Sequence, residues 1–209
     1  MILYCIRHGE SVYNAEGRIQ GQADVPLSER GVRQGQAVAE ALGRFPIEAI
    51  YSSPLQRALA TARMIAEPRG LAVRTDPRLM EINAGIFQHR LSSELVRLYP
   101  EPFARWSSGD PDYVIPGGES RAALRGRGLA AFQAIRAAGH RQAAVVAHGR
   151  LLVVTLQALV PIPEDRLVDA LHNGSITTIA FGEDGVAELL GLDQTDHLDG
   201  IGPCGDGDL

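Results

Sequence analysis

The chain has 209 residues, a formal net charge of −5 at pH 7 and no lysine, so its 20 Lys and Arg positions are all arginine. This length allows one domain with a full hydrophobic core, and 45% hydrophobic residues is ordinary for a globular protein. The absence of lysine excludes Schiff-base chemistry and a phosphate-loop lysine. Because no arginine follows Arg166 and the C-terminal third is acidic, we do not expect a nucleic-acid partner.

No run of about 18 apolar residues occurs, so we expect neither a membrane span nor a membrane partner. Met1 leads straight into a strand pattern, which is not typical of a signal peptide. Cys5 and Cys204 lie far apart in the sequence and are expected to be free thiols in a reducing compartment. These observations favour a cytoplasmic protein, and they leave its oligomeric state open, a homodimer included.

Strand-like and helix-like segments alternate along the chain. Short apolar runs and a turn at 182–185 predict strands at 2–7, 49–51, 71–73, 142–147, 175–181 and 186–192. Helices are predicted from an N-cap at Ser28 to about Gly43, and at 55–66, 119–138 and 150–159. Ser52 and Ser53 before Pro54 are expected to cap the second of these helices. This alternation predicts a three-layer α/β/α domain with a mostly parallel sheet.

The domain is expected to span residues 1–199, followed by a Gly/Asp-rich, frayed tail at 200–209. Residues 8–27 are expected to form a loop. Residues 83–117 resemble a small insertion over the site, with short helices around 92–98 and 102–107 and several prolines between and around them.

Two of the predicted strands end in His-Gly. The first delivers Arg7, His8 and Gly9, and the strand at 142–147 delivers His148 and Gly149. Ligand sites in open α/β sheets lie beyond the carboxyl ends of the strands, so Arg7, His8 and His148 are expected around one pocket. Two imidazoles beside a guanidinium suit a phosphoryl group.

Further motifs occur in a fixed order along residues 2–192, and together they resemble the histidine phosphatase superfamily, the phosphoglycerate mutase-like or "RHG" group. The motifs are Arg7-His8-Gly9-Glu10-Ser11 with Asn14, Gln20-Gly21, Ser52-Ser53-Pro54-Leu55 with Arg57, Leu79-Met80-Glu81-Ile82 with Gly85, Pro116-Gly117-Gly118-Glu119-Ser120, His148-Gly149 and Asn173-Gly174-Ser175. The resemblance implies the phosphoglycerate mutase-like fold.

The resemblance also implies roles for the site residues. His8 would attack phosphorus as a neutral imidazole and form a phosphohistidine. Arg7, Arg57 and His148 would hold the phosphoryl oxygens and stabilise the transition state, aided by backbone N–H groups at the helix start after His148. Glu81 would serve as general acid and then general base. Asn14, Gln20, Gly21 and Gly149 would bind substrate, and neither a metal nor another cofactor is expected.

Each of these residues also has a structural interpretation. His8 could be a core histidine at a strand end, Arg57 a helix-surface arginine, and Glu81 a helix cap or the partner of an arginine. Ser53 is expected to cap a helix and could also contact His8. One departure follows Gly85, where many relatives carry an aromatic or acidic residue and then a glycine. This chain reads Ile86-Phe87-Gln88-His89 and lacks that glycine.

Three functions fit these motifs. The leading one is a metal-independent phosphomonoesterase acting on a small phosphorylated metabolite through phosphohistidine on His8. The alternative is a phosphoglycerate mutase, although the insertion carries Arg97 and Arg105 set apart rather than the paired arginines of that branch. The third is a non-catalytic phosphate-binding domain, which the full set of catalytic candidates argues against.

Overall fold

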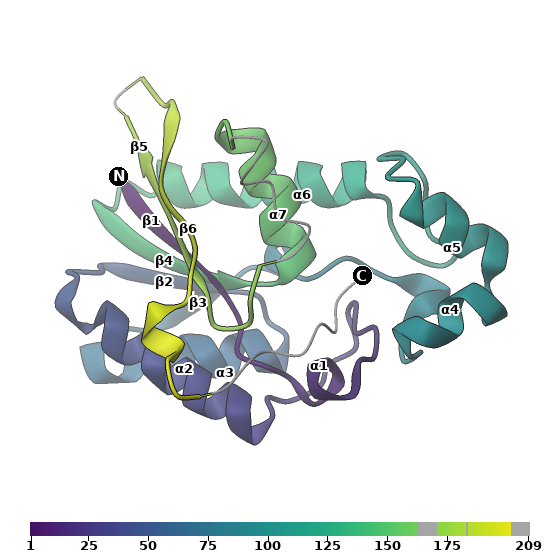
Figure 1. Ribbon diagram of the computed structural model, residues 1–209. Coiled ribbons are helices and arrows are strands. Elements are labelled where there is room, and N and C mark those ends of the chain that lie inside the picture. Colours follow the sequence, from purple (N-terminus) through teal and green to yellow (C-terminus); the bar gives the residue numbers. More distant parts are fainter. Residues whose placement is uncertain (163–170, 183, 202–209) are drawn as a thin grey trace.

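A computed structural model describes residues 1–162, 171–182 and 184–201. Its centre is a six-stranded sheet with the order β3-β2-β4-β1-β5-β6 (Figure 1). The first four strands in this order pair in parallel, whereas β5 and β6 are antiparallel to their neighbours. The predicted mostly parallel sheet is therefore confirmed, and so is the C-terminal hairpin.

The strands are β1 (Ile2–Arg7), β2 (Ala49–Ser52), β3 (Val73–Thr75), β4 (Gln142–Ala147), β5 (Ile176–Phe181) and β6 (Ala187–Gln194). The α-helices are α1 (Val12–Glu16), α2 (Glu29–Ala41), α3 (Gln56–Ala66), α4 (Ser92–Leu98), α5 (Pro100–Ser107), α6 (Arg121–Ala137) and α7 (Gly149–Leu159). Short 3-10 turns are η1 (Leu42–Arg44), η2 (Glu67–Arg69), η3 (Pro77–Leu79), η4 (Gly85–Phe87) and η6 (Asp196–Leu198).

The two faces of the sheet are covered by different helices (Figure 1). Along β1, alternate side chains point to opposite faces. Leu3 and Cys5 belong to the core cluster that contains residues of α6 and α7, and Tyr4 and Ile6 belong to the one that contains residues of α2 and α3. Because both faces are buried, the strand sequence is continuously apolar rather than alternating. This gives the predicted three layers.

Three of the α-helices listed above, α1, α2 and α6, begin at a serine whose side chain accepts a capping hydrogen bond. Ser28 caps α2 and accepts a hydrogen bond from the Gly31 backbone N–H, as predicted. The predicted serine cap of α3 is wrong, because Leu55 is its N-cap and makes no side-chain capping bond. A further difference is α1, which lies within the segment predicted to be a loop and is capped by Ser11 and Asn14.

The insertion forms α4 and α5, close to the predicted positions. Phe87 packs edge-on against Phe103 of α5, with ring centroids 6.2 Å apart, which ties the insertion to the segment that follows Glu81. Figure 1 shows both helices beyond one end of the sheet. The division into one domain at 1–199 and a tail stays a prediction, since 202–209 lie outside the described residues.

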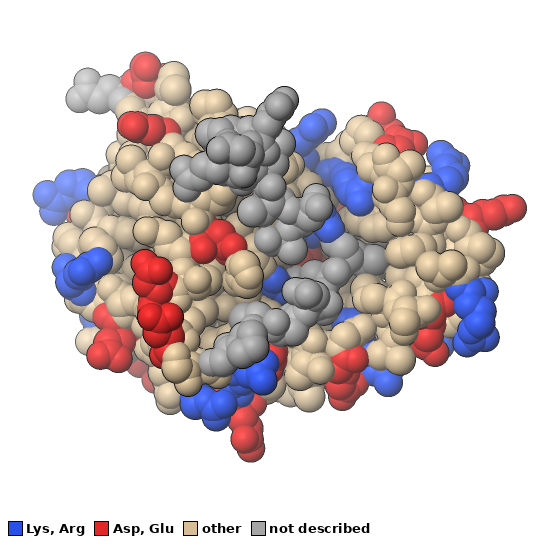
Figure 2. All heavy atoms as spheres, in the orientation of Figure 1, with Lys and Arg blue, Asp and Glu red and all other residues tan. Residues whose placement is uncertain are grey.

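Cys5 is a buried free thiol, and Cys204 falls outside the described residues. In the described part of the chain, no helix is both long enough and apolar enough to cross a membrane. Figure 2 shows acidic and basic side chains interspersed over one face, without a broad basic area among the described residues drawn there. That nucleic acid is not a partner stays a prediction.

Candidate active site

His8 follows the last residue of β1, at the carboxyl end of the parallel strands, and is 1% exposed. Its Nδ1 lies 2.6 Å from the Gly9 carbonyl oxygen, and its Nε2 accepts a hydrogen bond of 3.2 Å from Arg57 Nε. A carbonyl oxygen can only accept and a guanidinium can only donate. The ring proton therefore sits on Nδ1, and Nε2 keeps its lone pair.

The turn after His8 depends on close backbone contact. A Cβ atom built on Gly9 would lie 2.3 Å from the Gly31 carbonyl oxygen, and one on Gly31 would lie 1.9 Å from the Glu10 carbonyl oxygen. Only glycine allows the loop and the first turn of α2 to approach this closely. Gly9 and Gly31 thus allow the backbone just after His8 to pack directly against α2.

Arg57 lies in the first turn of α3 and is completely buried. Besides its contact with His8, it donates from Nη1 to the Ala23 carbonyl oxygen at 2.7 Å and from Nη2 to the Gly21 carbonyl oxygen at 2.8 Å. Gly21 has a φ of +52° and Ala84 lies against it. Arg57 is therefore held in a fixed orientation beside the imidazole rather than lying on the helix surface.

His148 follows β4 and is the N-cap of α7, and its ring lies against His8 with a centroid separation of 5.0 Å. Its Nε2 lies 2.8 Å from Ser53 Oγ. Its Nδ1 is buried and makes no hydrogen bond among the described residues. Ser53 thus contacts His148, the other histidine of the site.

Burial lowers the pKa of His148 well below its usual value, and electrostatic interactions with Arg57, His8, Arg127 and Arg7 lower it further. A buried imidazolium beside these arginines is costly, so His148 is neutral near pH 7. The ring thereby acts as a neutral hydrogen-bonding group beside His8.

The remaining predicted residues surround this centre. Arg7 is 4% exposed and donates to the Leu171 carbonyl oxygen. Asn14 and Gln20 are buried and are linked through Ser11, whose hydroxyl lies 3.1 Å from Asn14 Oδ1 and 2.6 Å from Gln20 Oε1. Gly149 is the first residue of α7. The structure therefore brings the arginines and both histidines together.

Asn173 belongs to the Asn-Gly-Ser motif, and the sequence predicted no role for it. It donates from Nδ2 to the His8 carbonyl oxygen at 3.1 Å and to Asn14 Oδ1 at 3.2 Å. It therefore fixes the backbone of His8 from the side of β5. The sequence signal for it was its place in the Asn-Gly-Ser motif.

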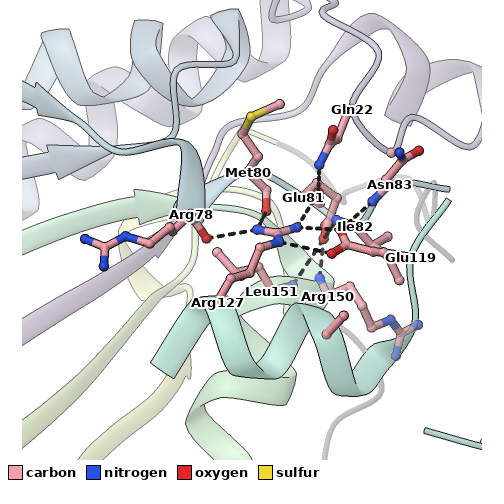
Figure 3. Close-up of polar contacts among 12 residues, drawn as sticks. Gln22, Arg78, Met80, Glu81, Ile82, Asn83, Glu119, Arg127, Arg150 and Leu151 are labelled. Carbon is pink, nitrogen blue, oxygen red and sulfur yellow. Dashed lines mark hydrogen bonds and ion pairs between the residues drawn. The ribbon is translucent and has the colours of Figure 1, made fainter. Parts of the chain in front are cut away.

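Glu81 lies between η3 and η4, and its carboxylate is bound at the start of α7 (Figure 3). Oε1 accepts from the backbone N–H groups of Ile82 at 2.8 Å and Leu151 at 3.1 Å. Oε2 accepts from the Arg150 backbone N–H at 3.0 Å. Such contacts suit an ionised carboxylate at a helix N-terminus.

This arrangement changes one expectation. The backbone N–H groups after His148 were expected to be available to a phosphoryl group, but those of Arg150 and Leu151 donate to Glu81 instead. Glu81 therefore does cap a helix, as its structural interpretation suggested. The same contacts hold the carboxylate two to three residues from His148 in α7, so the two interpretations are compatible.

His89 lies in the segment that lacks the expected glycine, and its backbone has a conformation that favours glycine, with a φ of +68°. Residues with a Cβ adopt this region at a cost, although histidine does so more often than most. Its Nδ1 lies 2.9 Å from the Tyr13 hydroxyl, and the side chain is exposed. The turn at His89 therefore has a positive φ without a glycine.

Among the described residues, no group of three or more His, Cys, Asp or Glu side chains could hold a metal ion. The cationic side chains nearest His8 are arginines. The expectation of a site without a metal stays a prediction.

Comparisons with known proteins agree with this geometry. Residues 3–193 match the family model of the histidine phosphatase superfamily, branch 1. The chain is 39% identical to phosphoserine phosphatase 1 of Hydrogenobacter thermophilus over 144 residues, which is 69% of this chain and 68% of that protein. It is 36% identical over 185 residues to a Yersinia pestis protein named "Probable phosphoglycerate mutase GpmB", covering 87% of this chain and 85% of that one.

A solved structure is similar over nearly the whole length. The mycobacterial glucosyl-3-phosphoglycerate phosphatase Rv2419c in complex with VO3 has a TM-score of 0.82 and 32% sequence identity, with 93% of this chain and 99% of that chain covered. The fold and the family predicted from the motifs are therefore confirmed.

Proposed function

The chain belongs to the histidine phosphatase superfamily, and from this we propose that it hydrolyses small phosphate monoesters through a phosphohistidine on His8. The predicted class, a phosphoric monoester hydrolase, agrees with the family and with the names of two of the three relatives above. The observation that carries the mechanism is the Nδ1–H tautomer of His8, which leaves the Nε2 lone pair next to a buried arginine.

In the first step, Nε2 of His8 attacks phosphorus while the bond from phosphorus to the ester oxygen breaks. Arg57 gives up its hydrogen bond to Nε2 and, with Arg7 and neutral His148, binds the phosphoryl oxygens. Arginine suits this role because its planar donors match two oxygens at once. A protonated Glu81 gives its proton to the leaving oxygen.

In the second step, water attacks phosphorus and the bond to Nε2 breaks, which releases inorganic phosphate and restores His8. Glu81, now a carboxylate, takes the proton from water. The contacts of Glu81 with the start of α7 support this second role, since they are the contacts of an ionised carboxylate. Asn14, Gln20, Gly21 and Gly149 are the proposed residues around the rest of the substrate.

The mutase alternative requires a cover that keeps water from the phosphohistidine and cations that grip a carboxylate. The 36% identity to a protein named as a probable phosphoglycerate mutase favours this alternative. However, Arg97 is exposed, and Arg105 is 65% exposed, pairs with Asp110 at 3.6 Å and stacks on Tyr113. These contacts support hydrolysis, because neither arginine is held in a cluster with the other.

Phosphorus NMR separates the two functions. Incubation with 3-phosphoglycerate and a trace of 2,3-bisphosphoglycerate is expected to release inorganic phosphate, with little 2-phosphoglycerate formed. A parallel panel should include phosphoserine, glucosyl-3-phosphoglycerate and sugar phosphates, because the relatives' names point to the first two. Isomerisation much faster than phosphate release would establish the mutase, and no turnover of any ester would exclude both enzymes.

A further inference from the structure

Arg127 takes no part in the two chemical steps above. It makes several hydrogen bonds to residues beside Glu81 (Figure 3). It lies in the middle of α6 and reaches across to the segment between η3 and η4. Its side chain is 20% exposed, and it pairs with Glu119 at 2.7 Å.

The guanidinium of Arg127 binds three backbone carbonyl oxygens of one short segment. Nη1 donates to Arg78 at 2.8 Å and to Met80, and Nη2 donates to Glu81 at 2.8 Å. Carbonyl groups that converge in this way fix the local backbone, because the planar guanidinium holds its donors in one geometry. The backbone of Glu81 therefore cannot rotate without breaking contacts to Arg127.

Glu119 binds both the guanidinium of Arg127 and the backbone of Asn83, which follows Glu81 in the chain. Its Oε1 and Oε2 accept from Nη2 at 2.7 Å and from Nε at 3.1 Å of Arg127. Glu119 Oε1 also accepts from the Asn83 backbone N–H at 2.7 Å, and the Glu119 backbone N–H donates to the Asn83 carbonyl oxygen at 3.0 Å. The ion pair thus connects α6 to the chain on the far side of Glu81.

The carboxylate of Glu81 is fixed separately, by the backbone N–H groups of Arg150 and Leu151. Gln22 Nε2 donates to the Glu81 carbonyl oxygen at 3.0 Å, beside the bond from Arg127. Arg127 is also among the charges that, after burial, lower the pKa of His148. The guanidinium therefore lies close to the reacting groups although its hydrogen bonds go to backbone atoms and Glu119.

We propose that Arg127 is a positioning residue that places Glu81 for proton transfer to the leaving oxygen. This inference rests on the proposed function, in which Glu81 is the acid. Proton transfer requires placement within a hydrogen-bond length, and a displacement of about 1 Å can cost about 10²-fold in rate. The loss of Arg127 should then matter most where the leaving oxygen most needs a proton.

The test compares kcat/KM, which reports the step that releases the alcohol, for phenyl phosphate and 4-nitrophenyl phosphate, two esters of similar shape whose leaving groups differ in their need for a proton. Arg127→Met is expected to lower kcat/KM for phenyl phosphate about 10-fold or more and kcat/KM for 4-nitrophenyl phosphate less than about 3-fold. Arg125→Met, at an exposed arginine of the same helix, is the matched control and should match wild type with both esters.

Arg127→Lys keeps the charge but cannot hold three carbonyls and a carboxylate, so it should show the same selective loss in weaker form. This variant decides the question if Arg127→Met does not fold, as checked by circular dichroism. In a Glu81→Gln background, Arg127→Met should lower kcat/KM for phenyl phosphate by no more than about 3-fold, because the two changes remove one function.

Two results would overturn the inference while leaving the phosphatase intact. One is an equal loss with both esters, which a merely structural role produces. The other is a full additional loss in the Glu81→Gln background. A wild-type protein that hydrolyses neither ester would instead overturn the proposed function itself, so the two failures are distinguishable.

Discussion

Arg57 donates a hydrogen bond of 3.2 Å from Nε to Nε2 of His8, across 49 positions of sequence. The contact requires Nε2 to be unprotonated, and the Gly9 carbonyl oxygen at 2.6 Å from Nδ1 requires the proton on the other nitrogen. The protein thus prepares the nucleophilic tautomer before substrate arrives. Arg57 is itself fixed by the carbonyl oxygens of Gly21 and Ala23, so no large movement is needed to form this pair.

Arg57→Lys should therefore reduce kcat/KM about 10²-fold or more, although the charge is kept. A lysine has one ammonium and cannot contact Nε2 of His8 and two carbonyl groups in the same geometry. Steady-state kinetics with 4-nitrophenyl phosphate measure the loss. Arg33→Lys, at an exposed position of α2, is the control and should behave as wild type. A mild loss in Arg57→Lys would mean that only the charge matters.

Glu81→Gln should lower the rate far more for alkyl phosphates than for 4-nitrophenyl phosphate, because a nitrophenolate leaves with little protonation. General acid–base help is typically worth about 10²- to 10⁴-fold. The amide oxygen can still accept from the backbone N–H groups of Ile82 and Leu151, although the NH2 group cannot accept from that of Arg150. Similar losses on both kinds of ester would leave Glu81 with only its role as the cap of α7.

Because the pKa of His148 is lowered in the folded protein, the free energy of unfolding should depend on pH. Below about pH 6.5 the unfolded chain protonates this imidazole, while the folded protein does not. Unfolded molecules then bind more protons, so the free energy of unfolding falls as pH falls, down to the pKa in the folded state. This residue contributes a slope of at most about 1.4 kcal/mol per pH unit.

Urea unfolding at several pH values in buffers without phosphate measures this slope. His148→Gln should show a shallower decline than wild type between about pH 6.5 and 5, because the glutamine does not titrate. Identical slopes would indicate that His148 accepts a proton in the folded protein despite the surrounding arginines.

His89 offers a test of backbone strain. Its φ of +68° favours glycine, so His89→Gly should unfold with a free energy about 1 kcal/mol higher than His89→Ala. Both variants lose the contact with Tyr13, which makes them a matched pair. At an ordinary position glycine is the less stable of the two by about 0.5–1 kcal/mol. The opposite order would show that the turn is relaxed in solution.

The sequence predicted the buried strands best. The bounds of β1 and β4 agree with the prediction at both ends, because buried parallel strands are continuous apolar runs. The two His-Gly ends then placed His8 and His148 together, since strands side by side in parallel end at the same edge of the sheet. Topology, more than local propensity, made this part of the site predictable.

Tertiary contacts explain what the sequence did not predict. Ser53 has the residue type of a helix cap, but its hydroxyl contacts His148. The short helix α1 depends on Ser11 and Asn14, which also contact Gln20 and Asn173. Arg127 was missed because most of its partners are carbonyl oxygens, which every residue has, so no pairing of side chains marks it in the sequence.

The central claim is a covalent phosphohistidine on His8, and rapid-quench labelling tests it most directly. Wild-type protein mixed with a ³²P-labelled substrate and quenched within milliseconds should carry label that is lost in acid and kept in base. Peptide mapping should place it on His8, His8→Ala should carry none, and His140→Ala, changed two residues before β4, should label as wild type does. Near-wild-type turnover by His8→Ala, or stable label on another residue, would contradict the account.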